Sequence, residues 1–197
     1  MYNSDIMLKN IIKYYKGVTN RALENLKNEK NFQFKKNLTN KTLEQATTDH
    51  LQKLNNSKQA NKLIAEYRQA MRGMSEVAQT EYNRYLNIIK STNDKDLKQK
   101  MLNNIANRGI HGFTGKDGKH WNIEGYSHMY TRHVNNQLIR LKVLENSNFD
   151  LFLVSKHGTI CDLCKPYEGK YLVRQELEDS PLFHPFCKHF IIEVEDE

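Results

Sequence analysis

All three cysteines of this 197-residue chain lie within its last forty residues, and their spacing is regular. Cys161 and Cys164 form a C-x2-C pair, and His184 and Cys187 repeat the same i, i+3 spacing about twenty residues later. A tight turn at each pair lets two ligand atoms meet one tetrahedral ion, with Zn–S bonds of about 2.3 Å. The sequence therefore predicts one structural zinc ion, bound by these four side chains.

The identity of the fourth ligand is open at this point. His184 is favoured because its spacing to Cys187 matches the first pair, His189 is the alternative, and His157 lies four residues before Cys161. Two other interpretations of the thiols also stay open, namely ordinary small core residues and a C-x2-C redox pair. Three thiolates and one imidazole would fill a tetrahedron and leave no position for a reactive water. The ion is therefore expected to support folding rather than catalysis.

Upstream of these residues, apolar side chains recur at helical spacing. Residues 4–28 fit one helix, and a second helix is expected to follow a cap at Thr39 or Asn40 and to end near Leu54. The segment 28–40 between them breaks the pattern. Only three prolines and nine glycines interrupt the whole chain, which also favours long helices.

The longest periodic segment opens at Ser57. Its apolar positions alternate steps of three and four as far as Ile89, as in a seam between packed helices. Asn93 is the predicted cap of the next helix, which is expected to end at Arg108, with Gly109 as its stop. The pattern predicts packing and indicates no cofactor site.

A glycine-rich stretch then predicts a loop or short hairpin, and Asn122 is placed to cap a further helix. After Asn148 the pattern changes to three short strands, at 149–155, 170–173 and 189–195. We therefore expect a mainly α fold, with an N-terminal bundle of long helices followed by a small C-terminal zinc-stabilised β module. The expected organisation is a helical region, a loop and helix leading onward, and the β module with the metal site, at 1–110, 111–148 and 149–197.

Charge is distributed unevenly along the chain. Residues 1–140 carry 24 Lys and Arg against 12 Asp and Glu, whereas residues 141–197 carry 6 against 11. A net charge of +12 on the helical part favours an anionic neighbour, either non-specifically bound DNA or an acidic protein surface. The alternative is a solvated lysine-rich face in a chain of biased composition, which also holds 22 asparagines.

Several classes of protein are disfavoured. The chain has no run of eighteen apolar residues and no signal-peptide pattern at its start, so we expect neither a membrane span nor a membrane partner, and synthesis in a reducing cytoplasm. No motif of a serine hydrolase or zinc protease is present. The alternatives that remain are a zinc-containing, treble-clef-like nuclease or a regulatory DNA-binding module. The nuclease would have to use histidines of the middle segment, namely His120, His128 and His133.

The cysteine and histidine motifs resemble the C-terminal domain of tailed-phage minor head proteins, the head-morphogenesis or minor capsid group. In that family a helical region precedes a C-x2-C pair, a Gly-Lys follows, and an H-P-x-C-[RK]-[HC] motif closes the domain. The corresponding segments here are Cys161 to Cys164, Gly169-Lys170 and His184 to His189. A weaker similarity lies upstream, in a Tyr-x-x-Met-x-x-Arg pattern formed by Tyr126, Met129 and Arg132. The resemblance covers roughly residues 108–192.

This resemblance implies a function that composition alone does not. It implies a virion structural protein that is assembled in the bacterial host cytoplasm and lies inside the phage head near the portal. It implies the portal protein or the major capsid protein as partners, and no enzymatic activity. Packaged DNA inside a head would also supply the anionic neighbour that the basic helical part favours.

Overall fold

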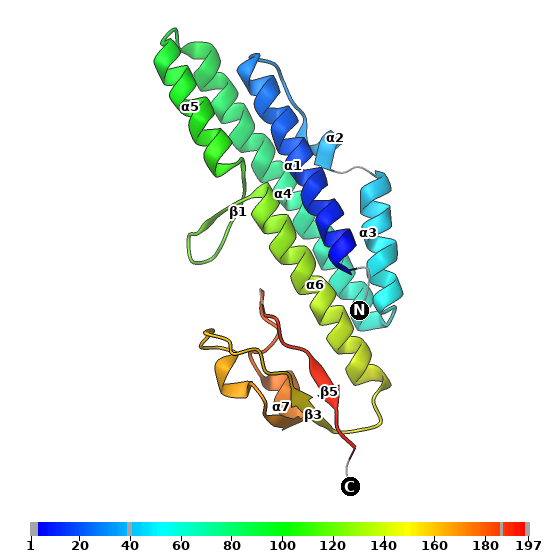
Figure 1. Cartoon of the computed structure of the whole chain (residues 1–197). Coiled ribbons are helices and arrows are strands. Elements are labelled where there is room, and N and C mark those ends of the chain that lie inside the picture. The colour runs from blue at the N-terminus through cyan, green and yellow to red at the C-terminus, as the bar shows by residue number, and fades with distance from the viewer. Residues whose placement is uncertain (1–3, 39–40, 186, 196–197) are drawn as a thin grey trace. The chain divides into compact units, whose positions relative to one another are not determined.

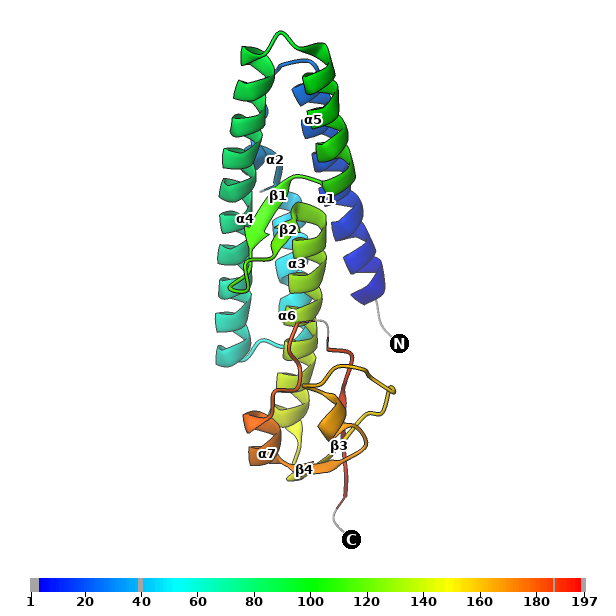
Figure 2. The ribbon, with the colours of Figure 1, turned by 90° about the vertical axis from the view of Figure 1, so that its left-hand side faces the viewer.

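The computed structural model describes residues 4–38, 41–185 and 187–195, and Figure 1 follows them from the N-terminal helices to the C-terminal sheet. Its first helices are α1 (Ser4–Lys27), α2 (Phe34–Leu38), α3 (Lys41–Leu54), α4 (Lys58–Ser91) and α5 (Lys95–Arg108). A hairpin of β1 (His111–Thr114) and β2 (His120–Asn122) then leads into α6 (Ile123–Asn146), as Figure 2 shows. The C-terminal part contains β3 (Leu151–Val154), a 3-10 turn (Lys165–Tyr167), β4 (Tyr171–Val173), α7 (Arg174–Asp179) and β5 (Ile191–Glu193).

The expected fold class is confirmed, because a mainly helical chain ends in a small antiparallel sheet beside a Cys/His cluster. The chain divides into two compact units that do not follow chain order. We call them the helical unit (Met1–Thr47 with Glu66–His128) and the C-terminal unit (Thr48–Ala65 with Met129–Glu197). The division at 110 and 148 that the sequence suggests remains a prediction. None of the described helices is both long and apolar enough to cross a membrane.

An aromatic cluster anchors the helical unit. The rings of Phe32, Phe34 and Tyr82 are buried, with centroids 5.0–5.9 Å apart. The Tyr82 hydroxyl donates to the carbonyl of Lys30 at 2.6 Å. The Gln79 side chain accepts from the Phe34 N–H at 2.7 Å and donates to the Phe32 carbonyl at 2.9 Å. These bonds satisfy the backbone of the segment before α2 by means of side chains from α4.

Three predicted helix ends are confirmed by their hydrogen bonds. Ser57 accepts from the Ala60 N–H at 3.2 Å at the start of α4, and Asn122 accepts from the Gly125 N–H at 2.7 Å at the start of α6. Gly109 follows α5 with a φ of 75°, a left-handed conformation that favours glycine. Short polar side chains and glycine at these positions therefore mark the helix ends directly in the sequence.

Two local predictions are corrected. The cap of α5 is Asp94 and not Asn93, because the Asp94 carboxylate accepts the N–H groups at 96 and 97, and a negative charge also suits the positive end of a helix. The segment 28–40 is not free of helix, since it contains α2. The other predicted caps, Thr39 and Asn40, lie outside the described residues, although α3 begins at the next residue.

The sheet of the C-terminal unit has the order β4-β3-β5, with all neighbours antiparallel. Its inner face packs in a small core that also contains two of the three cysteines, Cys164 and Cys187. Arg174, at the start of α7, ties this sheet to the end of α6. Its guanidinium donates to the carbonyls of Leu144 at 2.6 Å and Phe149 at 3.0 Å. Sequence periodicity missed α7, because a six-residue helix shows less than two turns of any pattern.

Candidate metal centre

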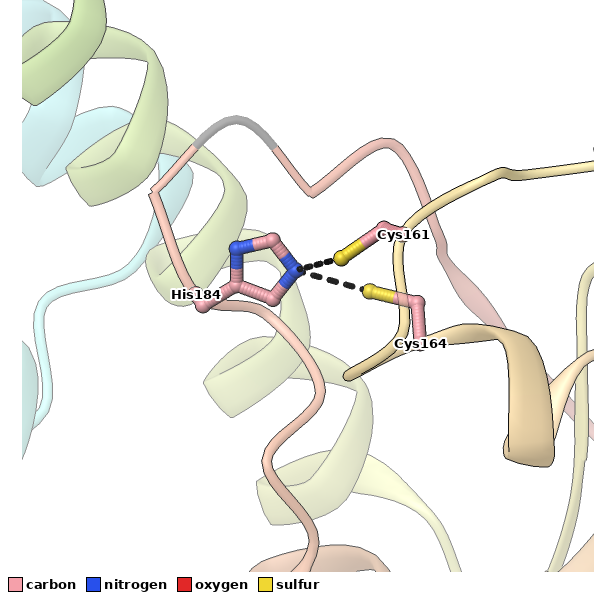
Figure 3. Close-up of side chains that lie close together, drawn as sticks. All are labelled: Cys161, Cys164 and His184. Atoms are coloured by element: carbon pink, nitrogen blue, oxygen red, sulfur yellow. Dashed lines mark hydrogen bonds between the residues drawn. The ribbon is translucent and has the colours of Figure 1, made fainter.

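The structure brings all three cysteine sulfurs and two histidine rings into one cluster. Figure 3 shows Nε2 of His184 facing two sulfurs, at 3.3 Å from Cys161 Sγ and 2.8 Å from Cys164 Sγ. Cys187 Sγ lies 3.6 Å from Cys164 Sγ and 3.3 Å from Nδ1 of His189. All three cysteines are free thiols. Their ligand atoms form two overlapping groups, and Cys164 belongs to both.

This donor set suits a tetrahedral metal ion. With Zn–S bonds of about 2.3 Å and Zn–N bonds of about 2.0–2.1 Å, neighbouring ligand atoms lie roughly 3.5–3.8 Å apart. Of the four contacts in the cluster, the one between Cys164 and Cys187 lies in that range at 3.6 Å, and the other three are shorter, at 2.8–3.3 Å. The cluster could therefore hold a metal ion once its side chains move apart. It offers five donors for four positions, so one of the two histidines would lie outside a single coordination sphere.

The first turn of the cluster is built by its own backbone. The N–H groups of Cys164 and Lys165 both donate to the Cys161 carbonyl, at 3.1 and 2.9 Å, and the hydroxyl of Thr159 accepts from the Cys161 N–H at 3.1 Å. The backbone amides of Cys164 and Leu163 also lower the pKa of the Cys161 thiol. Burial, by contrast, raises the pKa of the Cys164 thiol. A positive ion would remove that conflict by stabilising both thiolates.

The second turn is held by α6. The Cys187 N–H donates to the His184 carbonyl at 2.9 Å, which closes the turn. Side-chain amides of α6 bind it on both sides, with Asn136 donating to the Cys187 carbonyl at 3.1 Å and Gln137 donating to the Phe183 carbonyl at 2.7 Å. Phe183 has a φ of 66°, which costs a non-glycine residue roughly 1 kcal/mol or more. The surrounding contacts thus hold a strained backbone that presents His184 and Cys187 to the first turn.

Each histidine of the cluster has its outer nitrogen bound by an acceptor. Nδ1 of His184 lies 2.7 Å from the Pro185 carbonyl, and Nε2 of His189 lies 3.0 Å from a carboxylate oxygen of Glu168. A carbonyl and an ionised carboxylate can only accept, so these outer nitrogens carry the protons. In the neutral form of each ring, the inner nitrogen then presents its lone pair towards the sulfurs. This is the arrangement in which imidazole binds a metal, with its ring orientation fixed from behind.

Glu168 was not singled out from the sequence, yet it organises the loop around the cluster. Its carboxylate accepts from the N–H groups of His157 and Thr159, at 2.8 and 3.1 Å, as well as from His189. Desolvation acts to raise the pKa of Glu168, but these three donors outweigh it and lower the pKa to about 2. The carboxylate is therefore ionised at neutral pH. An acidic residue close to a C-x2-C pair, with a histidine later in the chain, is the signal that could have identified it.

The other histidines considered in the sequence are placed elsewhere. The His157 ring stacks edge-on against His189, but its Nε2 bonds the Ser155 hydroxyl at 2.9 Å. The nuclease alternative would use His120, His128 and His133. Among the described residues, none of these three belongs to a group that could hold a metal ion. His120 instead bonds the Thr114 hydroxyl at 3.1 Å, in the β1–β2 hairpin.

Comparison with known proteins adds the family. The model of the family described as Phage minor capsid protein 2 matches residues 1–182, which is most of the chain. Neither the curated proteins nor the solved structures contain a match. The matched range includes Cys161 and Cys164 and ends shortly before His184. By this match over nearly its whole length, the chain belongs to the phage minor capsid protein 2 family.

Proposed function

We propose that this chain is a non-enzymatic structural component of the phage head, in which one zinc ion stabilises the C-terminal module. The observation that carries the proposal is the cluster itself, where Nε2 of His184 lies 3.3 and 2.8 Å from the sulfurs of Cys161 and Cys164, and the Cys187 sulfur lies 3.6 Å from that of Cys164. Cys161, Cys164, Cys187 and His184 would supply the four ligands. A coordination sphere that is filled by protein atoms stabilises a fold and leaves no site for an activated water.

His184 is the proposed fourth ligand because its Nε2 faces both sulfurs of the first turn. His189 contacts only Cys187 among the sulfurs, and its other nitrogen is occupied by Glu168. In this proposal His189 lies beside the coordination sphere, and its ring packs against the sulfur of Cys187. If His189 were the ligand, Glu168 would be the carboxylate that orients it. A change of Glu168 would then affect metal binding, which distinguishes the two assignments.

Location and partners form the second part of the proposal. Membership of a minor capsid family supports contact with other virion proteins, and we propose the portal or the major capsid protein as neighbours, inside the head. The net charge of +12 on residues 1–140 supports non-specific contact with packaged DNA. Such binding depends on counterion release, so it should weaken steeply as the salt concentration rises.

Two experiments test these parts separately. Elemental analysis of protein purified without chelators should find about one zinc per chain, and a metal-free chain with a fully folded C-terminal module would contradict the metal assignment. Mass spectrometry of purified virions, of empty heads and of isolated portals should find the chain in particles and enriched with the portal. Its absence from virions, or metal-dependent cleavage of plasmid DNA by the pure protein, would refute the structural role.

A further inference from the structure

One groove of the C-terminal unit combines an apolar lining with a cation. From α6 it is lined by Ile139, Arg140 and Val143, and from the opposite side by Phe183 and residues 188–191. Its volume is about 230 Å³, below the roughly 300–1,000 Å³ of typical small-molecule sites. The space therefore suits one or two side chains of another protein better than a cofactor.

Arg140 has a donor in this region that no described residue satisfies. Its Nε atom is buried and has no hydrogen-bond acceptor among the described residues. Its guanidinium carbon lies 5.1 Å from the centre of the Phe183 ring, so the ring covers one of its faces. Burial lowers the pKa of Arg140, and the nearby charge of Glu178 offsets this only in part. A buried donor without an acceptor is costly, and a guanidinium that also lines a groove is a good partner for a carboxylate.

The same groove also exposes apolar side chains. Ile139 is 40% exposed and Phe190 is 50% exposed. Two hydrogen bonds of 3.0 Å join the backbone of Phe190 to Ser155. The Ser155 N–H donates to the Phe190 carbonyl, and the Phe190 N–H donates to the Ser155 hydroxyl. An exposed aromatic ring on a fixed backbone, beside an arginine, is typical of the centre of protein–protein interfaces.

We propose that this groove binds a short segment of a partner protein that presents a large apolar side chain beside a carboxylate. The carboxylate would accept from Arg140, and the apolar side chain would pack against Ile139 and Phe190. Charge supports this choice, because Arg140 and the exposed Lys188 both line the groove and offer positive charge to a carboxylate.

The partner is taken to be a virion protein, and this step alone rests on the proposed function. N-acetyl-L-leucine is the smallest probe with both features, and N-acetyl-L-leucinamide lacks only the charge. We expect the acid, titrated into the full chain, to give saturable NMR shifts at the groove with a millimolar dissociation constant, at least about tenfold tighter than the amide. Inorganic phosphate, the probe for a nucleic-acid or general anion site, should bind at least tenfold more weakly than the acid.

Arg140→Met removes the charge at similar length, and Lys142→Met is the matched control, because Lys142 is exposed on the same helix outside the groove. Arg140→Met should abolish the preference for the acid over the amide, and Lys142→Met should preserve it. The thermal midpoint of Arg140→Met without ligand should be unchanged or higher, since an unsatisfied buried donor is removed. The proposal is overturned by equal binding of acid and amide, by phosphate binding as tightly as the acid, by unchanged preference in Arg140→Met, or by a large fall in its midpoint. None of these results would affect the zinc content or the virion location of the chain.

Discussion

In the helical unit, Phe32, Phe34 and Tyr82 pack ring against ring, while in the C-terminal unit the core of the small sheet includes the sulfurs of Cys164 and Cys187. The first interior is stabilised by burying large apolar side chains along long helices. The second gathers strands of only three or four residues around cysteines that could bind an ion as thiolates. Sheets that short seldom stand alone, and a metal is a common substitute for the missing core.

Removing the metal should have the largest effect and should be confined to the C-terminal module. Structural zinc contributes roughly 10–16 kcal/mol in small zinc-dependent peptides, more than a module of this size is expected to provide by packing. Cys164→Ser, or excess chelator, should therefore abolish the dispersed NMR signals of β3 to β5. The α1 and α5 signals should keep their positions.

Adding zinc back to the chelated wild-type protein is the control, and it should restore the lost signals. If the module kept its signals without metal, packing alone would stabilise both units. The two units would then not differ in what stabilises them.

Phe34→Ala is the converse experiment in the helical unit. Truncating a fully buried phenylalanine should lower the free energy of unfolding of this unit by about 3–5 kcal/mol, because it loses apolar contact and leaves a cavity. The zinc content measured by elemental analysis should stay at its wild-type value. If Phe34→Ala also lost zinc, the two interiors would be coupled, and the units would have to be treated as one folding entity.

The choice between the two histidines gives an effect of intermediate size. His184→Ala should weaken zinc affinity, measured by competition with a chromophoric chelator, more than a hundredfold, because it removes a ligand. Glu168→Gln keeps the size of the side chain but loses its charge. It should weaken affinity by less than about tenfold if His189 lies outside the coordination sphere. A loss of 10–100-fold would instead identify His189 as the ligand, oriented by Glu168.

The smallest expected effect is a loss of stability of the helical unit at alkaline pH. Burial raises the pKa of Tyr82 to about 12, against about 10 when unfolded. The folded state thus keeps its proton between those values while the unfolded state loses it. The contribution of Tyr82 to the free energy of unfolding is fully present below pH 10. It falls, by up to ~2–3 kcal/mol, as the pH rises towards 12.

Tyr82→Phe should flatten this fall and cost about 1 kcal/mol at neutral pH, because it loses the bond to the Lys30 carbonyl. Unfolding by denaturant, followed at several pH values, measures both quantities. Tyr171→Phe is the control, since that ring is 59% exposed and should leave the alkaline profile unaltered. An identical profile for Tyr82→Phe and the wild type would mean that other groups cause the fall.

Local patterns in the sequence were enough to predict the helical class, most helix ends and the three strands. Ser57, Gly109 and Asn122 could be assigned because capping depends on one side chain and the backbone next to it. The pairing of the C-x2-C turn with the His184 turn was likewise predicted, since metal-ligand spacing is itself a local pattern. The prediction of Asn93 as a cap failed because its neighbour Asp94 is also a good cap residue, and only the backbone conformation decides between them.

Tertiary structure alone decided what surrounds the Cys/His cluster. Glu168 lies behind His189, and Asn136 and Gln137 bind the second turn. Each is 21 to 51 residues away from its partner along the chain, and no local pattern links them. The same holds for the Arg140 groove, which exists only where α6 meets the stretch before β5. Periodicity and capping are short-range effects that the sequence records directly. The orientation of a ligand and the shape of a groove depend on long-range packing, which is determined only when the whole unit folds.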